Sequence, residues 1–206
     1  MEVTRMTRLK DKAFEIVINS MLITRLKHRV FAVLTTFMLI MISIFGVGGN
    51  DLRNMRQEIS LIFEQGTPIN PMSIQQQLDV ILAQSSNILV VAGRYLDGND
   101  ELLLAVQTSN NNLRTAETPT EKYHQKNILL SNVNLLHDEL NMISFQISER
   151  DNLYLSSALV NIASSERIIR NNKYNSIVTE FNEKLRRFPA NIISQVRGIE
   201  PVYIYG

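Results

Sequence analysis

One long apolar stretch interrupts the pattern of hydrophobic and polar positions along this chain. Residues 30–47 (VFAVLTTFMLIMISIFGV) contain no charged side chain. As a helix they would extend over about 27 Å, close to the ~30 Å hydrocarbon core of a bilayer. We therefore expect residues 30–48 to form a single transmembrane helix. The alternative is a buried helix of a soluble core, although such helices rarely extend this far without a charge.

Apolar residues of the remaining chain recur at steps of three and four, which is typical of packed helices. Glycine and proline are few, cysteine is absent, and no stretch alternates like a strand. We expect an all-α fold in which residues 49–198 form an antiparallel up-down bundle of about four long helices with coiled-coil-like seams. The absence of cysteine excludes disulfides and thiolate sites, so a hydrophobic core must hold this domain together.

Capping signals indicate where the helices begin and end. The helix that leaves the membrane is expected to end near Gly66, and Ser73 with Gln76 forms a capping box for the next one. Gly98 is a natural stop for that second helix, and Asn99 or Asp100 caps a third. The seam expected on the second helix is Ile74, Leu78, Ile81, Ser85, Ile88, Ala92 and Tyr95.

The second half of the bundle also has clear signals. Thr118 and Glu121 bracket Pro119 in a further capping box. That helix has the most regular seam of the chain, with a break expected near its last member: Leu129, Val133, Leu136, Leu140, Ile143 and Ile147. From about residue 149 to 188 two apolar stripes differ in register near Asn171 and Asn172, which predicts either one kinked helix or two. Asn110 lies at a seam position of the third helix, where it either fixes the register or lies at the rim.

The uneven distribution of charge predicts the membrane topology. Residues 1–29 carry seven Lys or Arg against three acids, a net charge of +4, whereas the whole chain has a net charge of +1. Basic flanks stay on the cytoplasmic side, so Arg25, Lys27 and Arg29 predict a cytoplasmic N-terminus and an extracytoplasmic C-terminal domain. No aromatic residue beside this patch is placed to stack on bases, so we expect the lipid bilayer, and no nucleic acid, as its partner.

A cleavable signal peptide is the alternative to an anchor. Residues 24–29 (TRLKHR) resemble the basic region of a signal, and residues 46–48 offer small side chains for cleavage. Against this, the apolar stretch exceeds the usual length of about 7–15 residues, and a long leader precedes it. A start at Met21 would shorten that leader and favour the signal peptide. The leader itself, residues 1–29, could instead lie on the membrane surface as an amphipathic helix.

A second stretch with open alternatives is residues 199–206 (IEPVYIYG), which we call the tail segment. It is apolar and short. We expect it either to pack as an extended strip against the bundle or to serve as a partner-binding strip.

One part of the sequence resembles the bacterial LemA family. The pattern YNxxVxxFNxxLxxFPANII at residues 174–193 is similar to the C-terminal signature of that family, and residues 87–102 resemble its central helix-loop-helix. The signature residues are Tyr174, Asn175, Val178, Phe181, Asn182, Phe188, Pro189 and Asn191. The resemblance implies a membrane-attached antiparallel helical bundle. It implies no activity.

The signature residues themselves point to structure. Tyr174, Val178, Phe181, Leu185 and Phe188 form one helical stripe, so we expect them in the core. Asn175 and Asn182 are seven positions apart and share a helix face. We expect their side chains to bond to a loop backbone or an opposing helix, with a ligand site or plain exposure as the alternatives. Pro189 with Asn191 is expected to cap a return turn.

Candidate chemistry is sparse. The three histidines, His28, His124 and His137, have no partner at metal-ligand spacing, and residues 97–101 lack the ligand spacing of a calcium loop. The acids Glu166, Glu180 and Glu183 suggest no catalytic pair. We therefore expect no metal, no cofactor and no catalytic residue.

These expectations together predict a non-catalytic envelope protein that binds a protein partner or itself. The alternative is a small-ligand sensor, a signal-transducing membrane protein or an enzyme, with a site inside the bundle lined by Asn175, Asn182 or Glu166.

Overall fold

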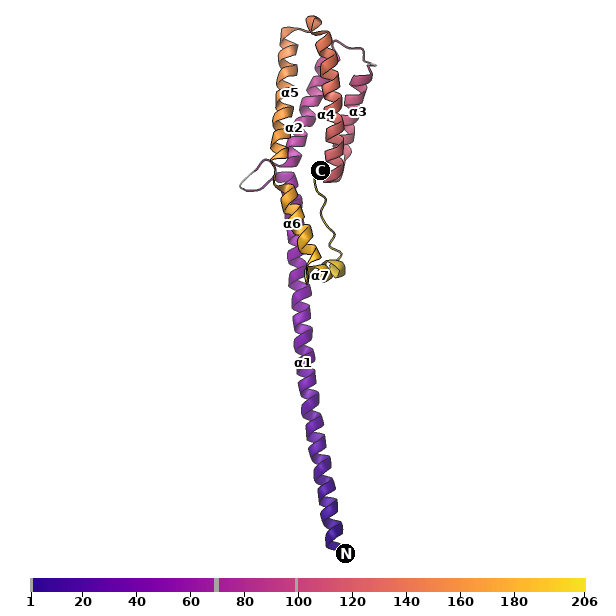
Figure 1. Cartoon of the computed structure of the whole chain (residues 1–206), viewed down its shortest axis with the longest axis vertical. Helices are drawn as coiled ribbons and strands as arrows, with labels where there is room; N and C mark the ends of the chain where they lie inside the picture. Colours follow the sequence, from indigo (N-terminus) through magenta and orange to yellow (C-terminus); the bar gives the residue numbers. More distant parts are fainter. Residues whose placement is uncertain (1, 69–70, 99) are drawn as a thin grey trace. The chain divides into compact units, whose positions relative to one another are not determined.

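The computed structural model describes residues 2–68, 71–98 and 100–206, with side chains from Arg29 onward (Figure 1). Within these ranges the chain is all-α and has no strand. It divides into two compact units, Met1–Asp51 and Leu52–Gly206. The predicted fold class, an apolar N-terminal helix followed by a packed helical bundle, is confirmed.

Helix α1 (Glu2–Gln65) forms the first unit up to Asp51. Its stretch Arg29–Gln65 is long and apolar enough to cross a membrane, and among the described residues it is the one helix that meets this test. The hydroxyls of Thr35 and Thr36 donate to carbonyls one turn earlier, at 2.8 and 2.9 Å, so their polarity is satisfied within the helix. The side chains of Arg25, Lys27 and His28 lie outside the described residues, as does any amphipathic face of the leader.

From Leu52 onward α1 contributes to the core of the second unit. Leu52, Ile59 and Phe63 are buried, in keeping with the three- and four-residue steps of the sequence. The helix ends at Gln65, as predicted. Gly66 follows with φ +82°, a left-handed conformation that favours glycine, and its N–H donates to the carbonyl of Ile62 at 3.0 Å.

Four helices form the bundle: α2 (Ile74–Ala92), α3 (Glu101–Thr115), α4 (Pro119–Met142) and α5 (Glu149–Arg170). Helix α2 packs against α5 and α3, and α3 packs against α4 (Figure 1). The predicted N-caps Ser73, Asp100 and Thr118 are confirmed, because each cap side chain accepts a backbone N–H of the first turn. Ser148 caps α5 in the same way. The fully buried side chains include Leu78, Ile81, Ile88, Val106, Leu129, Val133, Leu136 and Leu140.

Two helix ends differ from the prediction. Helix α2 ends at Ala92 rather than at Gly98, because Arg94 and Tyr95 leave the helix and bind Asp151 on α5. Helix α4 ends at Met142 and a 3₁₀ turn, η1 (Ser144–Gln146), follows it. The apolar seam continues past the helix end, since Ile147 is buried without being helical.

The change of register near Asn171 separates two helices, α5 and α6 (Tyr174–Arg186). The side chain of Asn172 stabilises this break, because it accepts the N–H of Tyr174 at 2.9 Å and donates to the carbonyl of Met72 at 3.2 Å. Of the two alternatives drawn from the sequence, the structure has two helices.

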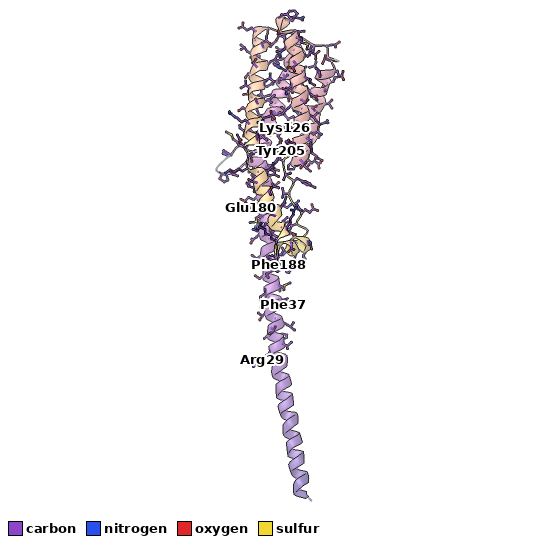
Figure 2. The ribbon with its side chains drawn as sticks, viewed as in Figure 1. Arg29, Phe37, Lys126, Glu180, Phe188 and Tyr205 are labelled. Atoms are coloured by element: carbon purple, nitrogen blue, oxygen red, sulfur yellow. The ribbon has the colours of Figure 1, made fainter. Side chains whose placement is uncertain are left out.

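The region after α6 contains a helix that the sequence reasoning missed, α7 (Ala190–Arg197). The expectation that Phe188 lies in the core was wrong, because its side chain is 79% exposed (Figure 2). Helix α6 ends at Arg186, so the helical stripe that buries Tyr174, Val178, Phe181 and Leu185 stops before it reaches position 188. Pro189 precedes α7 without a side-chain cap, and Asn191 accepts the N–H of Ile192 at 2.8 Å.

Candidate functional site

Two asparagines on α6 hold the tail segment by its backbone. The amide of Asn182 donates to the carbonyl of Val202 and its oxygen accepts the N–H of Val202, both at 2.9 Å. The amide of Asn175 does the same for Tyr205, at 2.7 and 2.8 Å. We call the side chains of Asn175 and Asn182 the asparagine clamp. The expectation that these residues bond to backbone is confirmed, as is the packing of the tail segment as an extended strip.

The spacing of the clamp matches the spacing of the residues that it holds. Seven positions along an α-helix cover about 10.5 Å. The three steps from Val202 to Tyr205 cover about 10 Å in an extended chain. Each asparagine is therefore spaced to meet the N–H and the C=O of one residue of the segment. Because every bond goes to main-chain atoms, the clamp recognises an extended backbone rather than particular side chains.

An aromatic cluster continues the clamp. Tyr205 packs edge-on against Tyr123 of α4, with ring centroids 5.4 Å apart, and lies 6.0 Å from the ring of Phe63 of α1. Phe63 in turn packs 5.2 Å from Tyr174, whose hydroxyl donates to the carbonyl of Tyr203 at 3.0 Å. The tail segment thus joins three helices of the second unit.

Burial changes the acidity of two tyrosines in this cluster. Desolvation raises the pKa of Tyr174 to about 12, and it raises the pKa of Tyr205 well above the ordinary value for a phenol. Both hydroxyls are therefore neutral at physiological pH. The hydroxyl of Tyr205 is buried and has no hydrogen-bond partner among the described residues.

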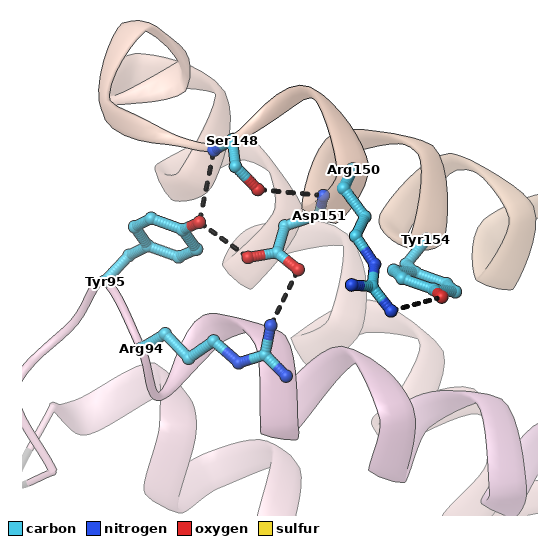
Figure 3. A network of polar contacts seen from close by, with 6 residues as sticks. All are labelled: Arg94, Tyr95, Ser148, Arg150, Asp151 and Tyr154. Atoms are coloured by element: carbon cyan, nitrogen blue, oxygen red, sulfur yellow. Dashed lines mark hydrogen bonds and ion pairs between the residues drawn. The ribbon is translucent and has the colours of Figure 1, made fainter.

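A second polar network closes the other end of the bundle (Figure 3). Asp151, on the first turn of α5, accepts from Arg94 Nη1 at 2.7 Å and from the Tyr95 hydroxyl at 2.6 Å. The Tyr95 hydroxyl also accepts the N–H of Ser148 at 3.1 Å. These bonds, above all the one from Tyr95, hold the pKa of the Asp151 carboxyl below its usual range. The network ties the end of α2 to the start of α5, which is a structural role.

The other polar residues singled out from the sequence are dispersed. Glu166 pairs with the buried Lys126 at 3.2 Å, while Glu180 and Glu183 lie exposed on α6. His137 lies 3.9 Å from Asp138, and the ring of His124 lies edge-on to that of Tyr123. Among the described residues no group of His, Asp or Glu could hold a metal ion. Asn110, at 4% exposure, accepts from the Ser85 hydroxyl at 2.6 Å, which favours the register-fixing alternative over the rim.

Two hollows adjoin the tail segment. One, of about 470 Å³, is lined by Asn175, Glu166, Lys126 and Tyr205, so the structure brings two of the three candidate ligand residues together. Asn182 is not among its lining residues. The other, of about 930 Å³, lies between the tail segment, the end of α1 and the start of α4. Four cationic side chains line it: Arg53, Arg56, Lys122 and Arg197.

Sequence reasoning found the clamp asparagines from their seven-residue spacing but could not identify what they hold. It missed Tyr205 and Tyr123 as parts of the site, and the only available signal was the concentration of tyrosines in the tail segment.

Comparison of the chain with models of known protein families gave no match, and comparison with curated proteins gave none either. The chain is thus identified as an all-helical protein with one long apolar N-terminal helix.

Proposed function

We propose that this chain is a non-catalytic, single-pass membrane protein of the bacterial cell envelope. In this proposal the N-terminus is cytoplasmic, and the helical unit outside the cytoplasm acts as a scaffold or protein-interaction module. The observation that carries it is the exposure of the apolar stretch: Phe31 is 71% and Val33 68% exposed, although both lie in an uncharged run. Surface of this kind requires lipid to cover it.

A relationship to the LemA family is part of the proposal. It is supported by the pattern at residues 174–193 and by the shared order of one apolar helix followed by a helical bundle, although the leader of 29 residues is long for this family. Three signature residues have clear structural roles here: Tyr174 is in the aromatic cluster, and Asn175 and Asn182 form the clamp.

The non-catalytic part of the proposal is supported by how the polar side chains are used. Both carboxylate oxygens of Asp151 accept a hydrogen bond, one from Arg94 and one from Tyr95, and Lys126 is paired with Glu166. Groups that are fully bonded within the fold are poorly placed to exchange protons with a substrate. We expect them to rigidify a surface that binds protein.

Cross-linking in intact membranes tests the interaction role. A scaffold should yield a specific envelope partner, or a defined oligomer, that is reproducible at low cross-linker concentration. A chain that remains monomeric and without a partner under these conditions would contradict the proposal.

A small-ligand sensor is the second candidate, favoured by the hollow of about 470 Å³ that Asn175 and Glu166 share. Ligand pockets of this size carry a few convergent polar groups. A metabolite screen by thermal shift should then find compounds that stabilise the natural chain and not its Glu166→Gln variant. A uniformly flat response would remove this candidate.

A further inference from the structure

The clamp has the properties of a peptide-binding site that is already occupied. It bonds to both main-chain groups of two residues and to no side chain of the tail segment. In peptide recognition by extended chains, main-chain hydrogen bonds supply affinity and side-chain pockets supply specificity. The asparagine clamp provides the first of these for any extended sequence.

Specificity comes from the positions where the side chains of the tail segment are covered. Tyr205 is 5% exposed between Phe63 and Tyr123, and Val202 is half-buried. By contrast, Tyr203 and Ile204 are exposed. The site therefore accepts an aliphatic residue, two unrestricted residues and then an aromatic ring.

The resident aromatic residue fits imperfectly. The hydroxyl of Tyr205 is buried with no hydrogen-bond partner among the residues that the structure describes. A buried and unsatisfied polar group is destabilising, and a phenylalanine of the same shape lacks that group. A peptide with Phe at this position should therefore bind better than the same peptide with Tyr.

Besides the clamp and the aromatic cluster, the segment is held by the buried Ile199, whose N–H donates to the carbonyl of Ser194 at 2.9 Å, and by two side-chain hydroxyls. The Tyr174 hydroxyl donates to Tyr203, and the Thr120 hydroxyl donates to the carbonyl of Ile204 at 2.8 Å. The segment is joined to α7 through Gly198, which has φ +62°. Ile199 and Tyr205 of the segment are buried, and Tyr205 contacts Tyr123 of α4, whereas the seams that join α2 to α5 are made by residues of those helices themselves.

We infer that the asparagine clamp is a binding site for an extended peptide of another protein with the pattern aliphatic-x-x-Phe, and that residues 202–205 are its exchangeable resident ligand. This inference rests on the proposed function, since it names the surface and the partner chemistry of the interaction module. The resident segment competes at the high effective concentration of an intramolecular ligand. A partner peptide therefore displaces it only when the partner's affinity and concentration are high enough to outweigh that advantage.

Fluorescently labelled peptides added to the full chain in detergent test this inference. The probes are EPVYIYG, which copies residues 200–206, and EPVYIFG, its counterpart with Tyr205→Phe. Anisotropy should show saturable binding of both, with the phenylalanine peptide about tenfold tighter because it lacks the unsatisfied hydroxyl.

Variants of the chain locate the binding site. Joint replacement Asn175→Ala and Asn182→Ala should abolish peptide binding, and Asn134→Ala, at an exposed asparagine of α4, should leave it unchanged. Tyr205→Phe within the chain should weaken binding of both peptides about tenfold, because it strengthens the resident segment. This last variant removes only a hydroxyl, so it keeps the test decisive even where the double variant does not fold.

Three outcomes would overturn the inference. The first is that neither peptide binds to the natural chain or to a Tyr205→Ala variant. The second is that the folded double variant of the clamp asparagines binds the peptides as the natural chain does, and the third is that Tyr205→Phe in the chain leaves the affinities unchanged. Failure here with specific cross-links retained in membranes would leave the scaffold proposal standing on another surface. Peptide binding without any cross-linked partner would instead support the clamp and count against the scaffold.

Discussion

Asp151 is the residue on which the network between α2 and α5 depends, because Arg94, Tyr95 and the cap of α5 all meet it. Its pKa is lowered in the folded chain, so its contribution to stability is present above the ordinary carboxyl pKa of about 3.9 and is lost as the pH falls through the lowered value. We expect Asp151→Asn to unfold at a lower temperature than the natural chain at pH 7.

The pH dependence separates this charge effect from a packing effect. The difference in melting temperature between Asp151→Asn and the natural chain should shrink as the pH falls below about 4, where the unfolded carboxylate gains a proton, and should vanish below the lowered pKa of the folded chain. Circular dichroism melts in detergent across this range measure it. The control is Glu149→Gln, an exposed acid on the same turn. A difference that stays constant down to the lowest pH would contradict the role given to the charge.

A second prediction at the residue scale concerns the buried pair Ser85 and Asn110. Ser85→Ala should lower the free energy of unfolding by about 1–3 kcal/mol, because it leaves the buried side-chain oxygen of Asn110 without its partner. Asn110→Ala should cost less, because the Ser85 hydroxyl keeps its bond to the carbonyl of Leu82 at 3.0 Å. The double variant should lose less than the sum, with a coupling of about 1 kcal/mol in a denaturant-based cycle. Ser86→Ala, whose hydroxyl donates to Leu82, is the control and should add to Asn110→Ala without coupling.

At the scale of elements, α4 offers a direct test of which face is buried. Leu136 is fully buried and its neighbour Leu135 is 51% exposed, so the two leucines differ in environment and not in chemistry. Leu136→Ala should lower the free energy of unfolding by about 2–5 kcal/mol through lost burial and a cavity. Leu135→Ala should change it by less than about 0.5 kcal/mol. Equal effects in denaturant unfolding would mean that α4 is rotated about its axis.

The same helix shows what local pattern can predict. The seam of α4 and the caps at Ser73 and Thr118 follow from residues within a few positions of one another, so the sequence contains all the information that they need. The ends of α2 and α6 do not follow from residues within a few positions. Helix α2 stops early because Asp151, 56 positions after Tyr95, competes for its last side chains, and this contact has no local signal.

The candidate site divides in the same way. That Asn175 and Asn182 share a face follows from their spacing, whereas their partners lie 30 and 20 positions away, at Tyr205 and Val202. A non-local pairing of this kind depends on where α7 turns the chain, and α7 is a short helix without a side-chain cap. The burial of Tyr205 among rings from other elements was therefore beyond reach of the sequence.

At the scale of the whole molecule, the exposed apolar stretch of α1 is the feature that most needs an external partner. A charge at the centre of a membrane-spanning helix costs about 2.5–3.5 kcal/mol on insertion scales. Leu39→Arg with Ile40→Arg should thus move the chain from the membrane fraction to the soluble or aggregated fraction. Val90→Arg, at a 64% exposed position of α2, should leave the chain in the membrane.

Protease treatment of whole and opened cells then tests the orientation and separates an anchor from a cleaved signal. An anchor with the positive flank inside predicts that the bundle is cut in whole cells once the protease reaches the outer face of the membrane, while residues 1–29 are protected until the cells are opened. Mass measurement of the mature chain should find the apolar stretch intact if it is an anchor. A cleaved signal would instead give a chain that begins near residue 49, and that chain would be absent from the membrane fraction even without a substitution. Deletion of residues 2–20 should preserve this orientation, since Arg25, Lys27 and Arg29 remain beside the apolar stretch. Loss of orientation in the deletion would show instead that residues 2–20 also contribute to the topology signal.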